Sequence, residues 1–238
     1  MANTSIESGV PAPKSLPARF FGIITSPRDT FASVAAHPEW FGMLATCVVL
    51  GAVLVAGFMF TQVGQDAWYD TVTTSRPLTD QQLQAFERMA PYAGYFALGQ
   101  MVIGLPLMLL VMSGILFAVF NAALGGQASF RQVFAVVVHA GPVGVVAQLF
   151  SMPLNYYRGT LTSAANLGAL LPMLSDTSFA SHFLGAIDVF LVWQVIVLAI
   201  GLGVLYRRRT QPIALSLLAV YAVIAVVIAV FKSRAGGA

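Results

Sequence analysis

Charged side chains are scarce in this sequence. Only 9% of its 238 residues are Asp, Glu, Lys or Arg, whereas 58% are hydrophobic, and the mean hydropathy is +0.82. A water-soluble globule of this size needs more polar side chains than this to cover its surface. The composition therefore excludes an ordinary soluble domain and indicates a protein that lies largely in lipid.

Cysteine and histidine are also rare, and the motifs of common enzyme classes are missing. One cysteine, Cys47, excludes an intrachain disulfide framework, and three dispersed histidines beside it do not form a metal site. The sequence has no phosphate-binding loop, and Ser113 lacks the glycine-flanked motif of a serine nucleophile. An intramembrane aspartyl protease would need two carboxylates, but the apolar runs hold one. We therefore expect no enzyme activity, no cofactor and no metal.

Long apolar runs fill most of the chain. Each is long enough to cross the roughly 30 Å hydrocarbon layer as a helix that rises about 1.5 Å per residue. The sequence predicts an all-α membrane bundle of five transmembrane helices in a single domain over residues 19–232, preceded by a disordered arm (1–18, without a signal peptide) and followed by a tail (233–238). The predicted spans cover residues about 41–61, 95–120, 130–152, 182–206 and 212–231.

A short amphipathic helix is predicted before the first span. Ser26 and Pro27, with Asp29 two residues further on, have the pattern of a capped helix start, and His37-Pro38 should end the helix. This helix would either lie on the membrane surface or pack on the bundle as a lead-in.

Two of the segments between the predicted spans are also expected to be ordered. In the polar loop 62–91, Thr79 and Gln82 have the spacing of a capping box that begins a helix. The apolar stretch 161–174 is too short to cross the bilayer, so we expect it to be re-entrant or interfacial.

The basic residues predict the orientation. The net charge of +3 does not indicate a nucleic-acid partner, because these residues flank apolar runs and do not alternate with exposed aromatic residues. A cytoplasmic amino terminus and an external carboxyl terminus place most of the loop charges inside, as the positive-inside rule requires. The inside set would be Lys14, Arg19, Arg28, Arg131 and Arg207 to Arg209, and the outside set Arg76, Arg88 and Arg158.

Asp188 is the carboxylate within a predicted span. At the bilayer centre an ionised aspartate costs about 2.5–3.5 kcal/mol. Counted back from Arg207 at about 1.5 Å per residue, however, Asp188 is roughly 28 Å from the inner boundary, close to the outer one. Gln148 and Gln100 fall at the same level. We therefore expect an outer polar cluster of these three side chains that fixes the helix register.

Prolines interrupt two of the predicted spans. Pro106 and Pro142 should each kink or break its helix. His139, beside Pro142, is then either a relay or pathway residue that the break exposes, or a neutral histidine bonded to a carbonyl that the proline frees.

Two further features point to contacts with the surroundings. Arg207, Arg208 and Arg209 end the fourth predicted span, and they either contact anionic headgroups or act as a pure topology signal. Small residues spaced four apart permit close helix contacts within or between chains, so we expect a protein partner or a homo-oligomer. These pairs are Ala52 with Ala56 and Gly114 with Ala118.

Three blocks together resemble the Yip family of Ypt/Rab-interacting membrane proteins in its bacterial form. They are IITSPRDTFASVAAHPEW (23–40), LGGQASFRQVFAVVVHAGP (124–142) and LGAIDVFLVWQVIVLAIGLGVL (184–205). The resemblance implies five transmembrane helices, a cytoplasmic amino terminus and a place in the bacterial cytoplasmic membrane. Eukaryotic members bind small GTPases through a long amino-terminal region, which is only a short arm here, so a Rab-type partner is not expected.

Two functions fit these features. The first is a multi-pass membrane scaffold that acts in membrane organisation or as the partner of another protein. The alternative is a small transporter, channel or lipid-handling protein that uses the Gly/Pro-interrupted second and third spans, because paired broken helices often line sites near the midplane.

Overall fold

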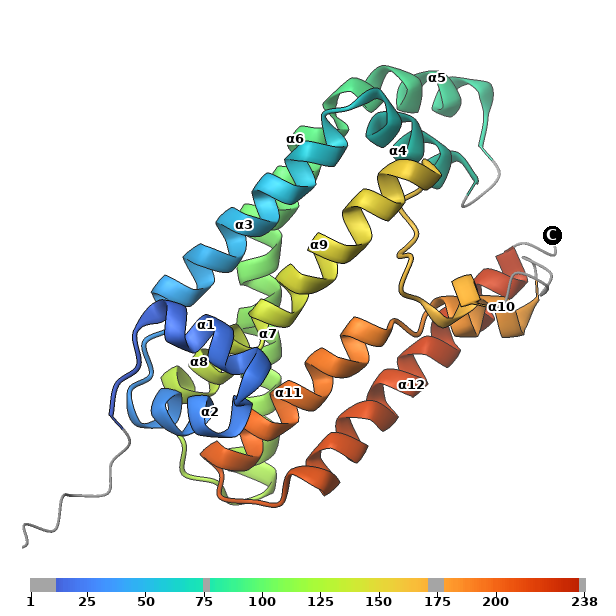
Figure 1. The fold of residues 1–238 in the computed structure, drawn as a ribbon. Helices are drawn as coiled ribbons and strands as arrows, with labels where there is room; N and C mark the ends of the chain where they lie inside the picture. The colour runs from blue at the N-terminus through green and yellow to red at the C-terminus, as the bar shows by residue number, and fades with distance from the viewer. Residues whose placement is uncertain (1–11, 75–77, 171–177, 236–238) are drawn as a thin grey trace, which may run out of the picture.

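The computed structural model describes residues 12–74, 78–170 and 178–235. Over these ranges the chain is helical and forms no strand, apart from an isolated bridge between Asn166 and Asp188. The longer helices run roughly alongside one another, so that turns and short helices gather at the two ends of the bundle (Figure 1).

Two short helices cover one end of the bundle. They are α1 (Leu16–Thr25) and α2 (Pro27–Ala36), which pack on each other, while α2 also packs on α8 and α11. Phe31 and Val34 of α2 are fully buried. The lead-in alternative therefore describes α2 better than a helix that lies on the membrane surface. The helix ends before His37-Pro38 as predicted, but Ser26 makes no capping hydrogen bond with its side chain.

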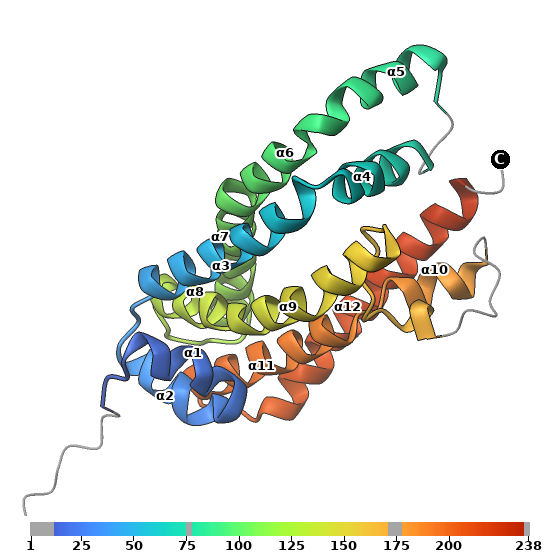
Figure 2. The same ribbon diagram turned by 45° about the horizontal axis from the view of Figure 1, so that its top comes forward.

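One long helical rod contains the predicted second span and extends it back into the predicted loop. After α3 (Phe41–Met59) and α4 (Gln62–Thr74), the chain stays helical from Asp80 to Ala123, as Figure 2 shows for α5, α6 and α7. The capping box of Thr79 and Gln82 is confirmed at its start. Pro106 does not break the rod, because it follows a π-helical turn and stands in the first turn of α7, where a missing N–H group is tolerated. The segments are α5 (Asp80–Met89), a 3₁₀ turn (Ala90–Tyr92), α6 (Ala93–Gly99), a π turn (Gln100–Gly104), α7 (Leu105–Phe117) and a second π turn (Ala118–Ala123).

The next hairpin leads to the most enclosed helix. A capping box of Ser129 and Gln132 starts α8 (Phe130–His139), in which every residue from 133 to 139 is buried. The break predicted at Pro142 is confirmed, because α8 ends at His139 and α9 (Gly141–Arg158) begins two residues later. The helix α9 continues past the predicted boundary at residue 152 and ends at Gly159, whose left-handed backbone (φ 60°) suits glycine.

The fourth predicted span, over 182–206, is broken rather than continuous. It forms α10 (Phe179–Gly185) and α11 (Val189–Leu205), because Asp188 has an extended backbone and caps α11. Then α12 (Thr210–Ala235) completes the bundle, with α10 packed on it. Of the stretch 161–174, residues 171–174 lie outside the described residues, while residues 167–170 form a 3₁₀ turn.

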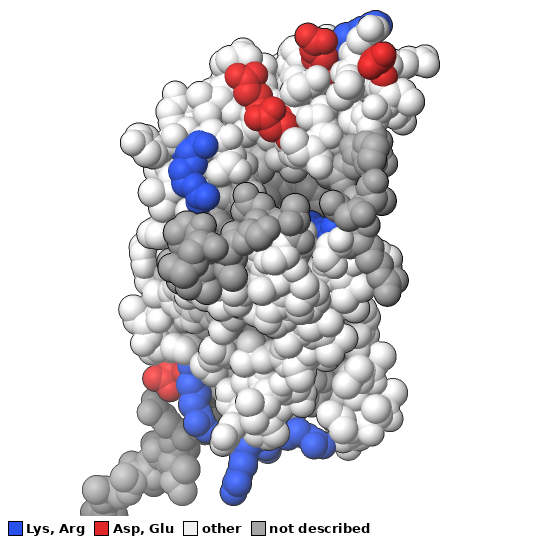
Figure 3. Space-filling model, turned by 90° about the vertical axis from the view of Figure 1, so that its right-hand side faces the viewer, with Lys and Arg blue, Asp and Glu red and all other residues white. Residues whose placement is uncertain are grey.

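Within the described residues, four helices are long and apolar enough to cross a membrane, compared with the five predicted. The apolar helix α11 has 17 residues and is shorter than these four. Basic side chains gather at the end of the molecule that carries the turn from α11 to α12, and acidic side chains gather at the opposite end (Figure 3). The four long helices are Phe41–Met59, Asp80–Ala123, Phe130–Arg158 and Thr210–Ser233.

Candidate functional site

The turn between α11 and α12 carries the three consecutive arginines. Arg207 has a positive φ of 52°, which is rare for a residue other than glycine. The backbone N–H of Arg208 donates to the carbonyl of Gly203 at 2.9 Å, and its guanidinium donates to the carbonyl of Leu124 at 2.7 Å. The turn is therefore fixed both to its own helix and to the neighbouring hairpin.

Tyr206 adds a second attachment to that hairpin. Its ring stacks on Phe120 with the ring centres 4.8 Å apart, and its hydroxyl donates to Oδ1 of Asn121 at 2.8 Å. The amide of Asn121 in turn donates to the carbonyl of Ala128 at 2.6 Å. These contacts hold the arginine turn in one position relative to α7 and α8.

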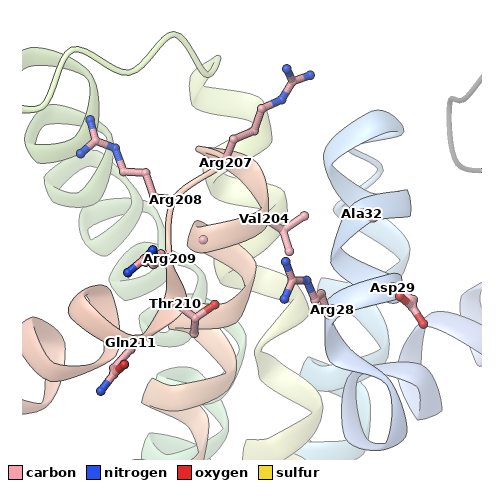
Figure 4. A pocket seen from close by; sticks show the side chains of 10 residues that line it. Arg28, Asp29, Ala32, Val204, Arg207, Arg208, Arg209, Thr210 and Gln211 are labelled. Carbon is pink, nitrogen blue, oxygen red and sulfur yellow. The ribbon is translucent and has the colours of Figure 1, made fainter.

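A hollow of about 790 Å³ lies between this turn and α2. Figure 4 shows Arg28 reaching from α2 toward the turn, whereas the carboxylate of Asp29 points to the other side of α2. Four arginines and one aspartate line the hollow, and the carboxylate of the aspartate is directed away from it, so the lining is strongly basic. Its residues are Arg28, Asp29, Ala32, Gly203, Val204, Arg207, Arg208, Arg209, Thr210 and Gln211.

The wall formed by α2 is as firmly held as the turn. The amide of Gln132 donates to the carbonyl of Ala35 at 3.0 Å, and the guanidinium of Arg131 donates to the carbonyl of Pro38 at 3.1 Å. On α11, a β-carbon at Gly201 would lie only 2.8 Å from the ring of Phe31. Because α2 approaches α11 this closely, the two sides of the hollow keep a fixed spacing.

Buried polar groups lie behind this wall. Arg19 is 8% exposed and pairs with Glu39, through its carboxylate at 3.0 Å and its carbonyl at 3.1 Å. His139 is fully buried, and its Nδ1 is 2.7 Å from the carbonyl of Ala135, so Nδ1 carries the proton if the ring is neutral. The bonded carbonyl belongs to the preceding turn of α8 and is not one freed by Pro142. Nε2 of His139 and Nε of Arg19 have no hydrogen-bond partner in the part of the chain that the structure describes.

Asp188 lies at the other end of α11, where its side chain is fully engaged. One carboxylate oxygen accepts from the backbone N–H groups of Phe190 at 2.8 Å and Leu191 at 3.2 Å, and the other accepts from the hydroxyl of Ser163. The hydroxyl of Tyr221 accepts from the backbone N–H of Asp188 at 3.0 Å and donates to the carbonyl of Ala186 at 2.8 Å. Asp188 therefore caps a helix and joins the loop before the 3₁₀ turn at 167–170 to α12.

The glutamines predicted to join Asp188 have other neighbours. Gln148 lies against Gly51 of α3, and its buried Oε1 has no hydrogen-bond partner among the described residues. The side chain of Gln100 lies over Gly104, one turn further along its own helix. Over the described ranges, none of the hydrogen bonds of Asp188 goes to either glutamine, because its oxygens are taken by the α11 cap and Ser163.

The remaining predicted residues are distributed over the bundle. Pro142 is buried in the first turn of α9, and Pro106 is half-buried on α7. Gly114 has open space beside it, and Ala118 is exposed, so this pair lies on an outward face. Ala52 and Ala56 are half-buried on α3.

Three residues of these sites were missed by the sequence reasoning. Arg28 shares a hollow with a turn that lies about 180 residues away in the sequence. Ser163 and Tyr221 bind the Asp188 region from 25 and 33 residues away. A usable signal was the place of Asp188 just before an apolar run, because aspartate in that position is typical of a helix N-cap.

Comparisons with known proteins agree with this membrane architecture. The family model of the Yip1 domain matches residues 21–231. The membrane protein YknW of Bacillus subtilis (strain 168) is 23% identical over 190 residues, which cover 76% of each chain. No solved structure matches the chain. Since the domain match extends over nearly the whole sequence, the chain belongs to the Yip1 domain family of membrane proteins.

Proposed function

We propose that this protein is a multi-pass membrane scaffold that binds a partner protein or a second copy of itself through an outward helix face, without catalysing a reaction. The observation that carries this proposal is the contrast between the interior and the outer faces. The helix α8 is buried along residues 133–139, which fills the centre of the bundle. The outer faces of α7 and α12, in contrast, expose branched apolar side chains to the membrane.

The proposed topology has five spans, namely the four long helices and, in addition, the shorter helix α11. Its 17 residues reach about 26 Å at about 1.5 Å per residue, which is the lower limit for a transmembrane helix. The basic end, with α1 and α2, would face the cytoplasm of a bacterial inner membrane, as the positive-inside rule favours. The acidic residues of α4 and α5 would then lie outside, together with the carboxyl terminus of α12. These residues are Asp66, Asp70, Asp80 and Glu87.

The face of α7 around Gly114 and Ala118 is the preferred contact surface. Small residues let another helix approach closely; among the described residues nothing lies within 4 Å of a β-carbon placed on Gly114, and Ala118 is exposed. Val111 and Ile115, which flank them, are 64% and 60% exposed. On α12, Val223 is exposed to the same degree, at 63%, but the small residues spaced four apart near it, Ala225 and Ala229, are buried.

Photocrosslinking in native membranes tests this surface. A photoreactive amino acid at position 111 or 115 should give a protein adduct of defined mass, whereas the matched position 223 should give none. Mass spectrometry of the adduct distinguishes a second copy of the chain from another protein. Adducts of equal yield at all three positions, or at none, would contradict the proposal.

A specific observation favours the transporter alternative. A π-helical turn stands before Pro106, and the chain breaks at Ala140 before Pro142, so two neighbouring membrane helices are irregular. Such irregularities often mark functional sites. Proteoliposomes of the purified chain decide the question: solute or lipid flux that His139→Ala abolishes would replace the scaffold with a transporter.

A further inference from the structure

We propose that the hollow between α2 and the α11–α12 turn binds the phosphate of an anionic phospholipid headgroup. The starting observation is that its guanidinium groups are free. Arg28, Arg207 and Arg209 are exposed, and their guanidinium groups make no hydrogen bond or ion pair with any residue that the structure describes. Of the four arginines, only Arg208 is engaged, by the carbonyl of Leu124.

The arginines line one hollow but come from separate elements. Arg28 begins α2, while Arg207 and Arg209 belong to the turn between α11 and α12. Like charges repel, and flexible surface arginines would spread apart, but both walls of this hollow are fixed by the contacts described above. A bound anion would relieve the repulsion between the three groups. Its binding would also require little reordering of the backbone.

The chemistry of the lining suits a phosphate group. Guanidinium groups bind phosphate oxygens through two parallel hydrogen bonds, which a point charge such as lysine cannot reproduce. Thr210 adds a hydroxyl group at the start of α12, where the first backbone N–H groups have no partner within the helix. The hollow, at about 790 Å³, has room for a headgroup larger than phosphate alone.

The position of the hollow favours a lipid over a soluble phosphate. Gln211 lines it, and only four residues further along, or about 6 Å, Leu215 of α12 is 60% exposed. The exposed apolar face of α12 continues from there through Val220 and Val223. A lipid with its phosphate in the hollow could therefore lay its acyl chains along this helix. This inference does not depend on the scaffold role.

Native mass spectrometry of the purified full-length chain in mild detergent tests the proposal. The probes are phosphatidylglycerol, phosphatidylcholine and inorganic phosphate. We expect phosphatidylglycerol to bind more tightly than phosphatidylcholine, and each Arg→Gln change at positions 28, 207 and 209 to weaken it about fivefold. Millimolar inorganic phosphate should compete weakly; competition as strong as that of the lipid would overturn the assignment to a headgroup.

Two variants distinguish a built site from general positive charge. Arg158→Gln removes an exposed arginine at the end of α9, which does not line the hollow or hold either of its sides, and it should leave lipid binding unchanged. A triple Arg→Lys variant at positions 28, 207 and 209 keeps the charge but loses the paired hydrogen bonds, so its lipid binding should fall at least fivefold. If Arg158→Gln weakens binding as much as Arg28→Gln, or if the triple lysine variant binds like the wild type, the proposal is wrong.

Discussion

Replacing Gly201 with alanine should destabilise the protein, whereas the same replacement at Gly114 should not. A β-carbon on Gly201 would lie 2.7 Å from Cγ1 of Val136 and 2.8 Å from the ring of Phe31. Carbon atoms normally approach one another to about 3.5–4.0 Å, so α2 or α8 must move by about 1 Å. Because Phe31 and Val136 are both fully buried, neither can turn away.

The magnitude follows from two opposing effects. Overpacking of this kind lowers the free energy of unfolding by about 1–3 kcal/mol, whereas replacing glycine by alanine inside a helix raises it by about 0.5–1 kcal/mol. At Gly114 a β-carbon meets nothing within 4 Å, so only the favourable effect remains. The helix effect is common to both sites, and the difference between the two variants therefore isolates the steric cost, about 1–3 kcal/mol.

The chain contains its own probe for this measurement. Cys47 is its single cysteine and is 6% exposed, so a fluorogenic maleimide labels it when the bundle opens. For a protein of this size, each kcal/mol of lost unfolding free energy lowers the unfolding temperature by about 2–4 °C. On heating, the midpoint temperature of labelling should therefore be several degrees lower for Gly201→Ala than for Gly114→Ala. Equal midpoints for the two variants would refute the close packing of α2 against α11 on which the basic hollow depends.

Three further predictions concern the other end of α11 and the topology. Asp188→Ala should lower the labelling midpoint by the equivalent of about 1–2 kcal/mol, and Asp188→Asn by less, because the amide oxygen can still cap the helix; equal losses would contradict the capping role. Tyr221→Phe should lower the free energy of unfolding by about 1–3 kcal/mol, since it leaves the N–H of Asp188 and the carbonyl of Ala186 unpaired. An unchanged labelling midpoint would show that these bonds contribute nothing to stability. Alkaline phosphatase fused after Ala238 should be active and a green fluorescent protein fused there should be dark; the reverse result would reject the five-span topology.

Features encoded by neighbouring residues could be predicted from the sequence. The capping box of Thr79 and Gln82, the hairpin before α8 and the break at Pro142 each depend on residues within one or two helical turns. Their geometry is determined by local hydrogen bonds and by the missing N–H group of proline. Such signals keep their meaning whatever the rest of the chain does.

Features that depend on distant contacts could not be predicted in this way. A carboxylate inside an apolar run has the same sequence pattern whether it faces another span or ends a helix. The partner that settles the matter for Asp188 is Ser163, on a loop 25 residues earlier. Likewise, nothing near Arg28 indicates that α2 folds back against α11, because that contact requires Gly201 and Phe31 to meet.

The two ends of α11 show how the use of hydrogen bonds separates structural ionisable groups from those available to a ligand. At its start, both carboxylate oxygens of Asp188 accept hydrogen bonds from the chain itself, so a ligand could bind there only by breaking the helix cap. Beyond its last turn, Arg207 and Arg209 keep their donors free among the described residues, although the backbone that carries them is fixed. An anion-binding surface requires donors that the protein itself does not use, on a rigid support, because binding then breaks no hydrogen bond within the chain. Asp188 is the one carboxylate in an apolar run, but its oxygens are used by the chain itself, whereas the free donors that the proposed lipid site needs lie at the arginine end.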